Sequence, residues 1–127
     1  PNGMALRDMQ AVQLRMSGAG ARIDAARKLV RGDMAEMQDY ANRSEVPELE
    51  RKLRAKRDVS YAVSLCGEAI DILTPLGGAH GIYDASPMQR VFRDNRAGAT
   101  HIQFNQDMNY ATWGLVALGG EVNSPYL

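Results

Sequence analysis

The chain contains a single cysteine, Cys66, and only two histidines, His80 and His101. A lone cysteine cannot form an internal disulfide, and Cys66 lies in an apolar stretch, so we interpret it as a small buried hydrophobic residue. Two histidines and one cysteine give none of the spacings that hold zinc or a related metal. No metal site is therefore predicted.

Neither charge is in excess, because 15 basic residues balance 15 acidic ones. No general attraction to nucleic acid is expected of such a chain. The basic run 51–57 is a local exception, and a solvated helix face is its preferred interpretation over a binding patch. No apolar run approaches the ~20 residues of a membrane span, and the first residues lack the features of a signal peptide. We expect a cytoplasmic protein with no membrane or nucleic-acid partner.

The sequence also lacks the alternation of apolar and polar residues that is typical of β-strands. With 127 residues, of which 45% are apolar, there is room for one domain with one core. Apolar residues recur instead at helical spacing, which predicts helices over about 4–40, 47–73 and 86–113, with a tail over 115–127. The predicted fold class is all-α, an antiparallel helical bundle of three main helices.

The first predicted helix carries a long row of apolar residues at intervals of seven. They are Met9, Met16, Ile23, Val30 and Met37. Two shorter helices cannot bury so long a row, so we expect either self-association or a further helix. In the second helix, the charged first part is expected in solvent and the apolar part from Val59 to Leu73 in the core.

The most informative stretch is 77–94, together with the histidine that follows it. A glycine-rich turn precedes a helix with Ser86 at its cap and Pro87 at its first position, and Ser86 to Gln89 fits the capping-box pattern. The helix carries the pair Arg93-Asp94, and His101 comes next. This order of features resembles the C-terminal helical domain of the acyl-CoA dehydrogenase fold. Within that fold it is most similar to the two-component monooxygenases that depend on reduced flavin.

The resemblance covers nearly all of residues 1–127 and assigns them to one bundle domain. Residues 10–29 look like the second helix of the four-helix bundle, 48–73 like the third and 86–113 like the fourth. The first bundle helix, the N-terminal helical domain and the β-domain of such enzymes have no counterpart here. The expected structure is therefore an incomplete four-helix bundle that forms an oligomer.

The resemblance also separates two chemistries. In acyl-CoA dehydrogenases a catalytic glutamate lies about two turns beyond the Arg-Asp pair, but residues 95–103 contain no carboxylate. In the monooxygenases the residue that matches His101 faces the flavin and the aromatic substrate, where an imidazole can donate a hydrogen bond or help to remove a proton. His101 is the candidate catalytic residue. The alternative for His101 is a helix histidine bonded to a neighbour within the bundle.

Four further residues are candidates through the same resemblance. Gly77, Gly78 and Gly81 resemble a loop that approaches the flavin of a neighbouring subunit, although glycines at this place also simply end a helix. Asn105 is a possible substrate-lining residue. For the arginines at 90, 93 and 96, salt bridges are preferred over a phosphate clamp.

The implied activity is hydroxylation of an aromatic or polycyclic substrate with dioxygen and reduced flavin, either FMNH2 or FADH2, supplied by a separate flavin reductase. The implied assembly is a homotetramer, and this stretch alone is expected to bind little or no flavin. Two alternatives remain at this point. One is the C-terminal domain of an acyl-CoA dehydrogenase, and the other is a non-enzymatic helical module that assembles through its methionine row.

Overall fold

The computed structural model describes residue 3 and residues 5–123, apart from the side chains of His80 and Ile82. Its α-helices are α1 (Gln10–Asn42), α2 (Leu49–Leu73), α3 (Pro87–Ala99) and α4 (Gln106–Ala117). Short 3-10 segments, η1 (Leu6–Asp8), η2 (Thr74–Ile82) and η3 (Ile102–Phe104), lie between or before them. The described part of the chain contains no strand, which confirms the all-α prediction.

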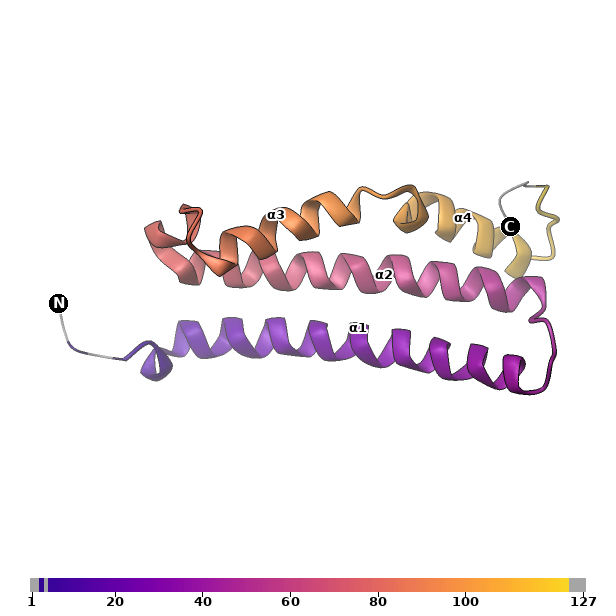
Figure 1. Cartoon of the computed structure of the whole chain (residues 1–127), viewed down its shortest axis with the longest axis horizontal. Helices are drawn as coiled ribbons and strands as arrows, with labels where there is room; N and C mark the ends of the chain where they lie inside the picture. Colours follow the sequence, from indigo (N-terminus) through magenta and orange to yellow (C-terminus); the bar gives the residue numbers. More distant parts are fainter. Residues whose placement is uncertain (1–2, 4, 124–127) are drawn as a thin grey trace.

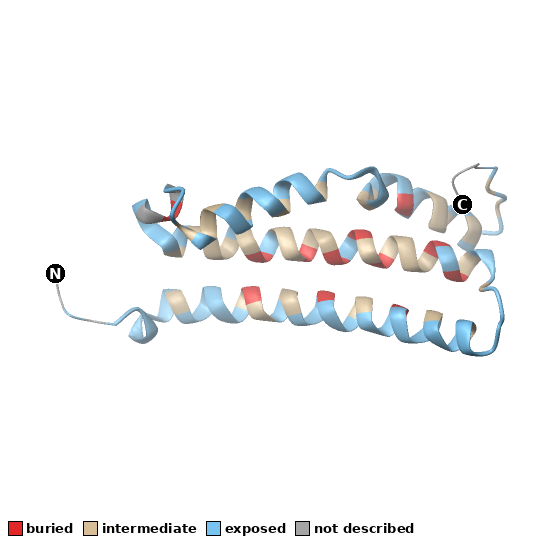
Figure 2. Ribbon diagram, viewed as in Figure 1, coloured by how far each residue is buried: buried red, intermediate tan, exposed pale blue. Residues whose placement is uncertain are grey.

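The helices form three antiparallel rows with α2 in the middle (Figure 1). One side of α2 packs against α1, and the opposite side packs against α3 and α4, which together run the length of the third row. The buried residues of α1 lie along its edge toward α2 (Figure 2). The array is thus an open layer, and this agrees with the predicted antiparallel bundle of three main helices.

Small residues bring α1 and α2 together. Ala19 and Ala26 on α1 are 1% and 4% exposed, and Ala62, Leu65 and Ala69 on α2 are similarly buried. Alanine has no side chain beyond Cβ, so two helices can approach closely along such a row. The core between α1 and α2 is therefore centred on alanines.

The methionine row itself is only partly in the core. Met16 is 55% exposed and Met9 is also exposed, whereas Ile23 and Val30 are partly buried. The exposed N-terminal end agrees with the expectation that the other helices of this chain cannot cover the whole row. In a straight helix a spacing of seven drifts by ~20° per step, so a long row cannot stay on one contact line.

The predicted third helix is two helices. It stops at Ala99 and resumes at Gln106, and the residues between include the short η3 segment. The interruption is locally stabilised, because Asn105 caps α4 by accepting a hydrogen bond from the Met108 N–H at 2.9 Å. At the other end of α3, Pro87 occupies the first turn as predicted. The Ser86 side chain makes no capping hydrogen bond, so the capping box is not formed.

The remaining boundaries differ from the predictions by a few residues. The first helix begins at Gln10 rather than near 4, and Met4 lies outside the described residues. The second begins at Leu49, with Pro47 just before it. The last helix reaches Ala117, and residues 124–127 of the predicted tail also lie outside the described part.

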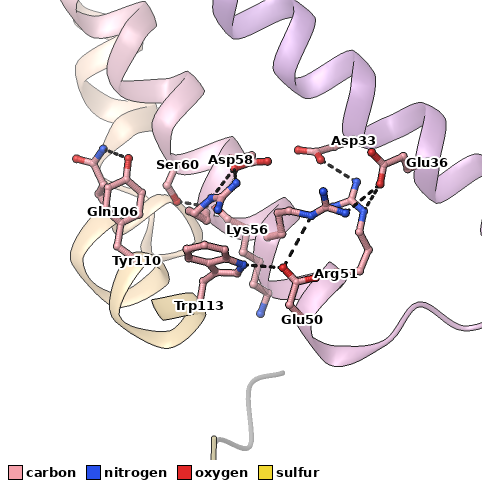
Figure 3. A network of polar contacts seen from close by, with 12 residues as sticks. Asp33, Glu36, Glu50, Arg51, Lys56, Asp58, Ser60, Gln106, Tyr110 and Trp113 are labelled. Carbon is pink, nitrogen blue, oxygen red and sulfur yellow. Dashed lines mark hydrogen bonds and ion pairs between the residues drawn. The ribbon is translucent and has the colours of Figure 1, made fainter. Parts of the chain in front are cut away.

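The charged first half of α2 is not in solvent. Arg51 is 1% exposed and Asp58 is 7% exposed, which makes the prediction for this half wrong. The Arg51 guanidinium donates to the carboxylate of Asp33 at 2.8 Å and also to that of Glu36, both on α1 (Figure 3). Paired carboxylates on the facing helix are what allow a charged side chain to be buried here.

The network continues to α4. The Trp113 indole N–H donates to Glu50 at 2.9 Å (Figure 3). The Arg57 guanidinium lies 4.1 Å from the centre of the Trp113 ring. A cation over an aromatic face is attracted by the ring quadrupole. Polar contacts therefore connect both α1 and α4 to the first half of α2.

The turn between α1 and α2 is closed by a hydrogen bond from the Tyr40 phenol to Glu48, 2.9 Å long. This bond is the chief cause that raises the pKa of Tyr40. The pKa of Glu48 lies below its ordinary value of 4.5, first because of a backbone hydrogen bond to the carboxylate and then because of Tyr40. A depressed carboxylate pKa stabilises the fold above the unfolded-state pKa. That contribution is lost as the pH falls through the lower folded-state value.

Tyr40→Phe should raise the pKa of Glu48 toward its ordinary value, because the phenol no longer stabilises the carboxylate. The pKa is followed by the carboxyl carbon shift in an NMR titration. The Glu48 contribution should then disappear at a higher pH in the variant than in the unaltered protein. An unchanged Glu48 titration would show that the phenol does not act on this carboxylate.

The segment Leu49–Ala79 is long and apolar enough, by length and composition alone, to cross a membrane. The central helix of a bundle passes the same test, and α2 is packed on both sides and contains the buried Arg51. The absence of a membrane partner stays a prediction.

An apolar groove of about 520 Å³ lies along one face of α2, between α1 and the end of α3. Its lining includes Ile23, Val30, Val59, Val63, Cys66 and Phe104. Cys66 is partly buried, packs against the Ala26, Ala62 and Leu65 cluster, and borders this groove. The bundle therefore leaves apolar surface uncovered, as the length of the first helix led us to expect.

Candidate functional site

His101 lies in the break between α3 and α4, on the exposed side of the chain. Its Nδ1 accepts a hydrogen bond from the Gln103 N–H at 3.2 Å, and its ring lies 5.8 Å from that of Phe104. When Nδ1 accepts a hydrogen bond, a neutral imidazole carries its proton on Nε2. His101 can therefore donate a hydrogen bond through Nε2 to a group outside this chain segment.

This position differs from that of the helix histidine considered as the alternative. The imidazole is bonded to the backbone of its own turn rather than to a side chain of a neighbouring helix. The break also orients it differently from a continuous helix, because His101 has extended backbone dihedrals of φ −63° and ψ 136°. The assignment of His101 as catalytic stays a prediction.

Asn105 stands at the other end of the break. Its side-chain oxygen is occupied as the cap of α4, and the residue also borders a polar pocket of about 480 Å³ between α2 and the break. The pocket is lined chiefly by hydroxyl, amide and charged groups. They include Ser60, Ser64, Glu68, Asp71, Asn95, Arg96, Gln106 and Asp107. Such a lining can hydrogen-bond a hydroxylated ligand, so the position of Asn105 is compatible with a lining role.

Sequence reasoning missed the α2 side of this pocket. Ser60, Ser64 and Asp71 recur at intervals of about four and seven, and so lie on one helix face. We had assigned this part of α2 to the core because of its apolar residues. The polar row was the signal that could have identified the second face.

The predicted glycine loop lies at the other end of α3 from His101 (Figure 1). At 1.5 Å per residue, the 13 residues of α3 separate the two by roughly 20 Å. Gly78 has φ 54° and ψ −153°, which requires glycine, and a Cβ on Gly77 or Gly78 would meet no atom within 4 Å. Gly81 is buried against the Thr74 carbonyl.

The glycine loop and His101 cannot therefore contact one small group within a single chain. Gly77 and Gly78 present bare, exposed backbone, whereas Gly81 is occupied by internal packing. The separation agrees with a flavin that contacts the glycine loop of one copy and His101 of another copy. That shared site stays a prediction.

The arginines of α3 form salt bridges, as preferred from the sequence. Arg90 pairs with Asp94 at 3.5 Å, and Arg96 pairs with Asp71 on α2. The Arg96 guanidinium also lies over the Phe92 ring at 5.1 Å. The Arg96–Asp71 pair holds α3 on α2, and the salt bridges occupy two of the three guanidinium groups that a phosphate clamp would need.

Within the described residues, no three or more His, Cys, Asp or Glu side chains are grouped so as to hold a metal ion. For a flavin, the chain offers one exposed imidazole with a donor nitrogen and one open glycine turn. The two groups lie at opposite ends of α3, so each can contact a flavin only together with groups from elsewhere. The rest of such a site must come from other copies or from other parts of a protein.

The family model described as the C-terminal domain of acyl-CoA dehydrogenase matches residues 1–106. Two curated relatives are each 29% identical to the chain. The oxygenase subunit HsaA of a flavin-dependent monooxygenase from Rhodococcus jostii RHA1 aligns with 92% of this chain. The oxygenase component of an FADH2-dependent resorcinol hydroxylase from Rhizobium sp. MTP-10005 aligns with 95% of it.

Among solved structures, XiaF from Streptomyces sp., in complex with FADH2 and glycerol, superimposes with a TM-score of 0.91 and 26% identity. The match covers 100% of this chain and 32% of XiaF. The chain spans about a third of the length of the curated relatives, 31% of each. Because the family model covers most of its length, the chain belongs to the acyl-CoA dehydrogenase C-terminal domain family.

Proposed function

We propose that residues 1–127 act as the C-terminal bundle domain of the oxygenase component of a two-component flavin-dependent monooxygenase. The substrate class is a small phenolic or polycyclic aromatic compound. The observation that carries the proposal is the break between α3 and α4, which presents His101 and, over 100–105, no carboxylate. The two relatives described above, both flavin-dependent oxygenases, support it.

The groups of the break suit hydroxylation of a phenol. His101 holds its proton on Nε2, from which it can donate a hydrogen bond to a substrate or cofactor oxygen. To accept a phenolic proton at Nε2, the neutral ring must first take its other tautomer, with the hydrogen on Nδ1 and without the bond from the Gln103 N–H; loss of the phenolic proton makes the substrate ring more electron-rich. Asn105 borders the neighbouring pocket and is the proposed lining residue.

Reduced flavin, when bound, supplies the activation of dioxygen. FADH2 is the proposed form, because it is named for the resorcinol hydroxylase and for XiaF. Gly77 and Gly78 of a neighbouring copy would meet the flavin with bare backbone N–H groups, which suit a phosphate or the adenine end. Gly81 supports that turn from within.

The remaining parts of the proposal follow from this role. A separate reductase delivers the reduced flavin, as the term oxygenase component implies for the relatives. The apolar groove on α2 supports burial in a larger assembly, for which we propose a homotetramer. Such an enzyme works in the cytoplasm, where reduced nicotinamides feed the reductase.

The test uses the protein as its gene encodes it, with chemically or enzymatically reduced FAD or FMN, dioxygen and a panel of phenols. Hydroxylated product, identified by mass spectrometry with one oxygen atom from ¹⁸O₂, is the expected result. Acyl-CoA thioesters serve as the competing substrates.

Two results would contradict the proposal. Oxidation of an acyl-CoA with no phenol hydroxylation would support the dehydrogenase alternative. This outcome requires a base other than residues 95–105, since the next carboxylate, Asp107, lies in the first turn of α4. A stable oligomer that binds no flavin and oxidises neither substrate would support the non-enzymatic module.

A further inference from the structure

Asn109 is the buried residue of α4, and its side chain is polar. It is 6% exposed, and its Nδ2 donates to the Ser60 hydroxyl at 2.6 Å and to the Gln103 carbonyl at 2.9 Å. An amide is buried at a considerable free-energy penalty unless its hydrogen bonds are made. An apolar side chain of the same size would fill the position without that requirement. The contacts of Asn109 therefore call for an explanation other than packing.

Those hydrogen bonds form a chain from Ser60 on α2, through Asn109 and Gln103, to the His101 imidazole. The Ser60 hydroxyl, 2% exposed, donates to the Lys56 carbonyl at 2.9 Å, so its oxygen is oriented to accept from Asn109. Asn109 in turn fixes the Gln103 carbonyl. The N–H of Gln103 then donates to His101 Nδ1.

We propose that Asn109 is a positioning residue, which sets the orientation and tautomer of His101 by holding Gln103 against α2. This deepens the proposed function and rests on it where activity is the measurement. Ser60 anchors Asn109 in turn. The Gln103 N–H and carbonyl belong to two successive peptide units that meet at its Cα. When Asn109 no longer holds the carbonyl, residue 103 can turn about its φ and ψ angles, and its N–H then leaves Nδ1.

Two substitutions remove the donor while keeping the size of the side chain. Asn109→Leu removes both polar atoms, and Asn109→Asp replaces the donor by an acceptor that faces the Gln103 carbonyl. Ser60→Ala removes the anchor but leaves the bond from Asn109 to Gln103. We expect a graded series, with a large effect of either Asn109 variant and a smaller effect of Ser60→Ala.

The first measurement is independent of activity. Side-chain ¹⁵N spectra of the full-length protein, labelled with ¹⁵N-histidine, report whether the neutral His101 ring carries its proton on Nε2. The unaltered protein should show this single tautomer, and the Asn109 variants should show a mixture of the two. An unaltered His101 signal in both variants would overturn the proposal, whether or not the protein is a hydroxylase.

The second measurement is hydroxylation of a phenol by the full-length enzyme with reduced FAD. A misdirected catalytic group lowers turnover rather than binding, so kcat should fall about 10- to 100-fold, while KM changes little. A rise of KM at constant kcat would contradict a positioning role. Absence of activity in the unaltered protein would count against the proposed function, and the tautomer measurement would still decide the role of Asn109.

Two controls separate positioning from stability. Thr112→Ala alters the same helix, where the hydroxyl bonds only to the Met108 carbonyl of its own turn, and should change neither measurement. Leu65→Ala removes a core side chain of α2 that is 7% exposed and lowers stability without touching the break. If Leu65→Ala disturbed the His101 tautomer as much as Asn109→Leu does, the effect would be one of general stability and the proposal would fail.

Discussion

Replacing Arg51 by alanine should lower the free energy of unfolding by about 3–5 kcal/mol, the range for removing one partner of a buried ion pair. The side chain is 1% exposed and is paired with two carboxylates of α1, of which Asp33 is itself 9% exposed. After the substitution Asp33 remains buried without its cation. Urea unfolding of the full-length protein, followed by circular dichroism, measures the loss.

The Arg51–Asp33 ion pair leaves buried polar atoms unsatisfied, so an apolar pair of similar size should stabilise the fold about as well. Arg51 Nη1 and Asp33 Oδ2 are buried without a hydrogen-bond partner. Burial disfavours the charged guanidinium, but Asp33 and Glu36 outweigh it, so the pKa of Arg51 lies above its ordinary value. The double variant Arg51→Met with Asp33→Leu should therefore recover most of the stability lost in Arg51→Ala.

Arg54 offers the matched control on the same helix. Its side chain is 38% exposed and pairs with Glu36 and Glu50, so Arg54→Ala should lower stability by only about 0–1 kcal/mol. Equal losses for Arg51→Ala and Arg54→Ala would show that the burial of Arg51 has no energetic consequence.

Replacing His101 by alanine should lower the rate of phenol hydroxylation about 100- to 10,000-fold, the usual contribution of a positioned acid or base. The residue is exposed on the break, so the fold should not depend on it. Product formation is measured in the full-length enzyme at saturating phenol, beside the unfolding midpoint. A large loss of rate with an unchanged midpoint is the expected combination.

His101→Gln distinguishes the two tasks of the imidazole. A glutamine amide can donate a hydrogen bond but cannot transfer a proton at neutral pH. Partial activity in this variant would assign His101 as a hydrogen-bond donor, and a loss equal to that of alanine would assign it as a base. Arg90→Ala, which breaks an exposed pair with Asp94, is the control expected to keep full activity. Full activity in both His101 variants would refute the assignment.

The sequence predicted the helices well but not the break between α3 and α4. Apolar residues continue at helical spacing across it, since Phe92, Ile102 and Trp113 all suit one long helix. Asn105 was the missed signal, because its side chain competes for a backbone N–H and starts a new helix. A capping hydrogen bond of this kind can end one helix and start another even where the apolar residues keep their helical spacing. The apolar pattern alone therefore does not show the break.

The burial of Arg51 could not be foreseen from α2 alone. A run of basic residues is ordinarily solvated, and the exception depends on Asp33 and Glu36, which come from another helix. The candidate site was similarly limited. His101 and the glycine turn came from resemblance, whereas Asn109 became visible only when α4 was placed against Ser60 of α2.

The central place of α2 has a consequence for how the chain can vary. Since α1 and α4 pack on opposite sides of α2, substitutions on these two outer helices alter separate interfaces. Their effects on stability should therefore add at positions outside the polar network that links Glu36 of α1 to Trp113 of α4 through Arg54 and Glu50, whereas a substitution on α2 changes what is tolerated on both sides. Away from that network the outer helices can diverge independently of each other, and α2 constrains the divergence of each.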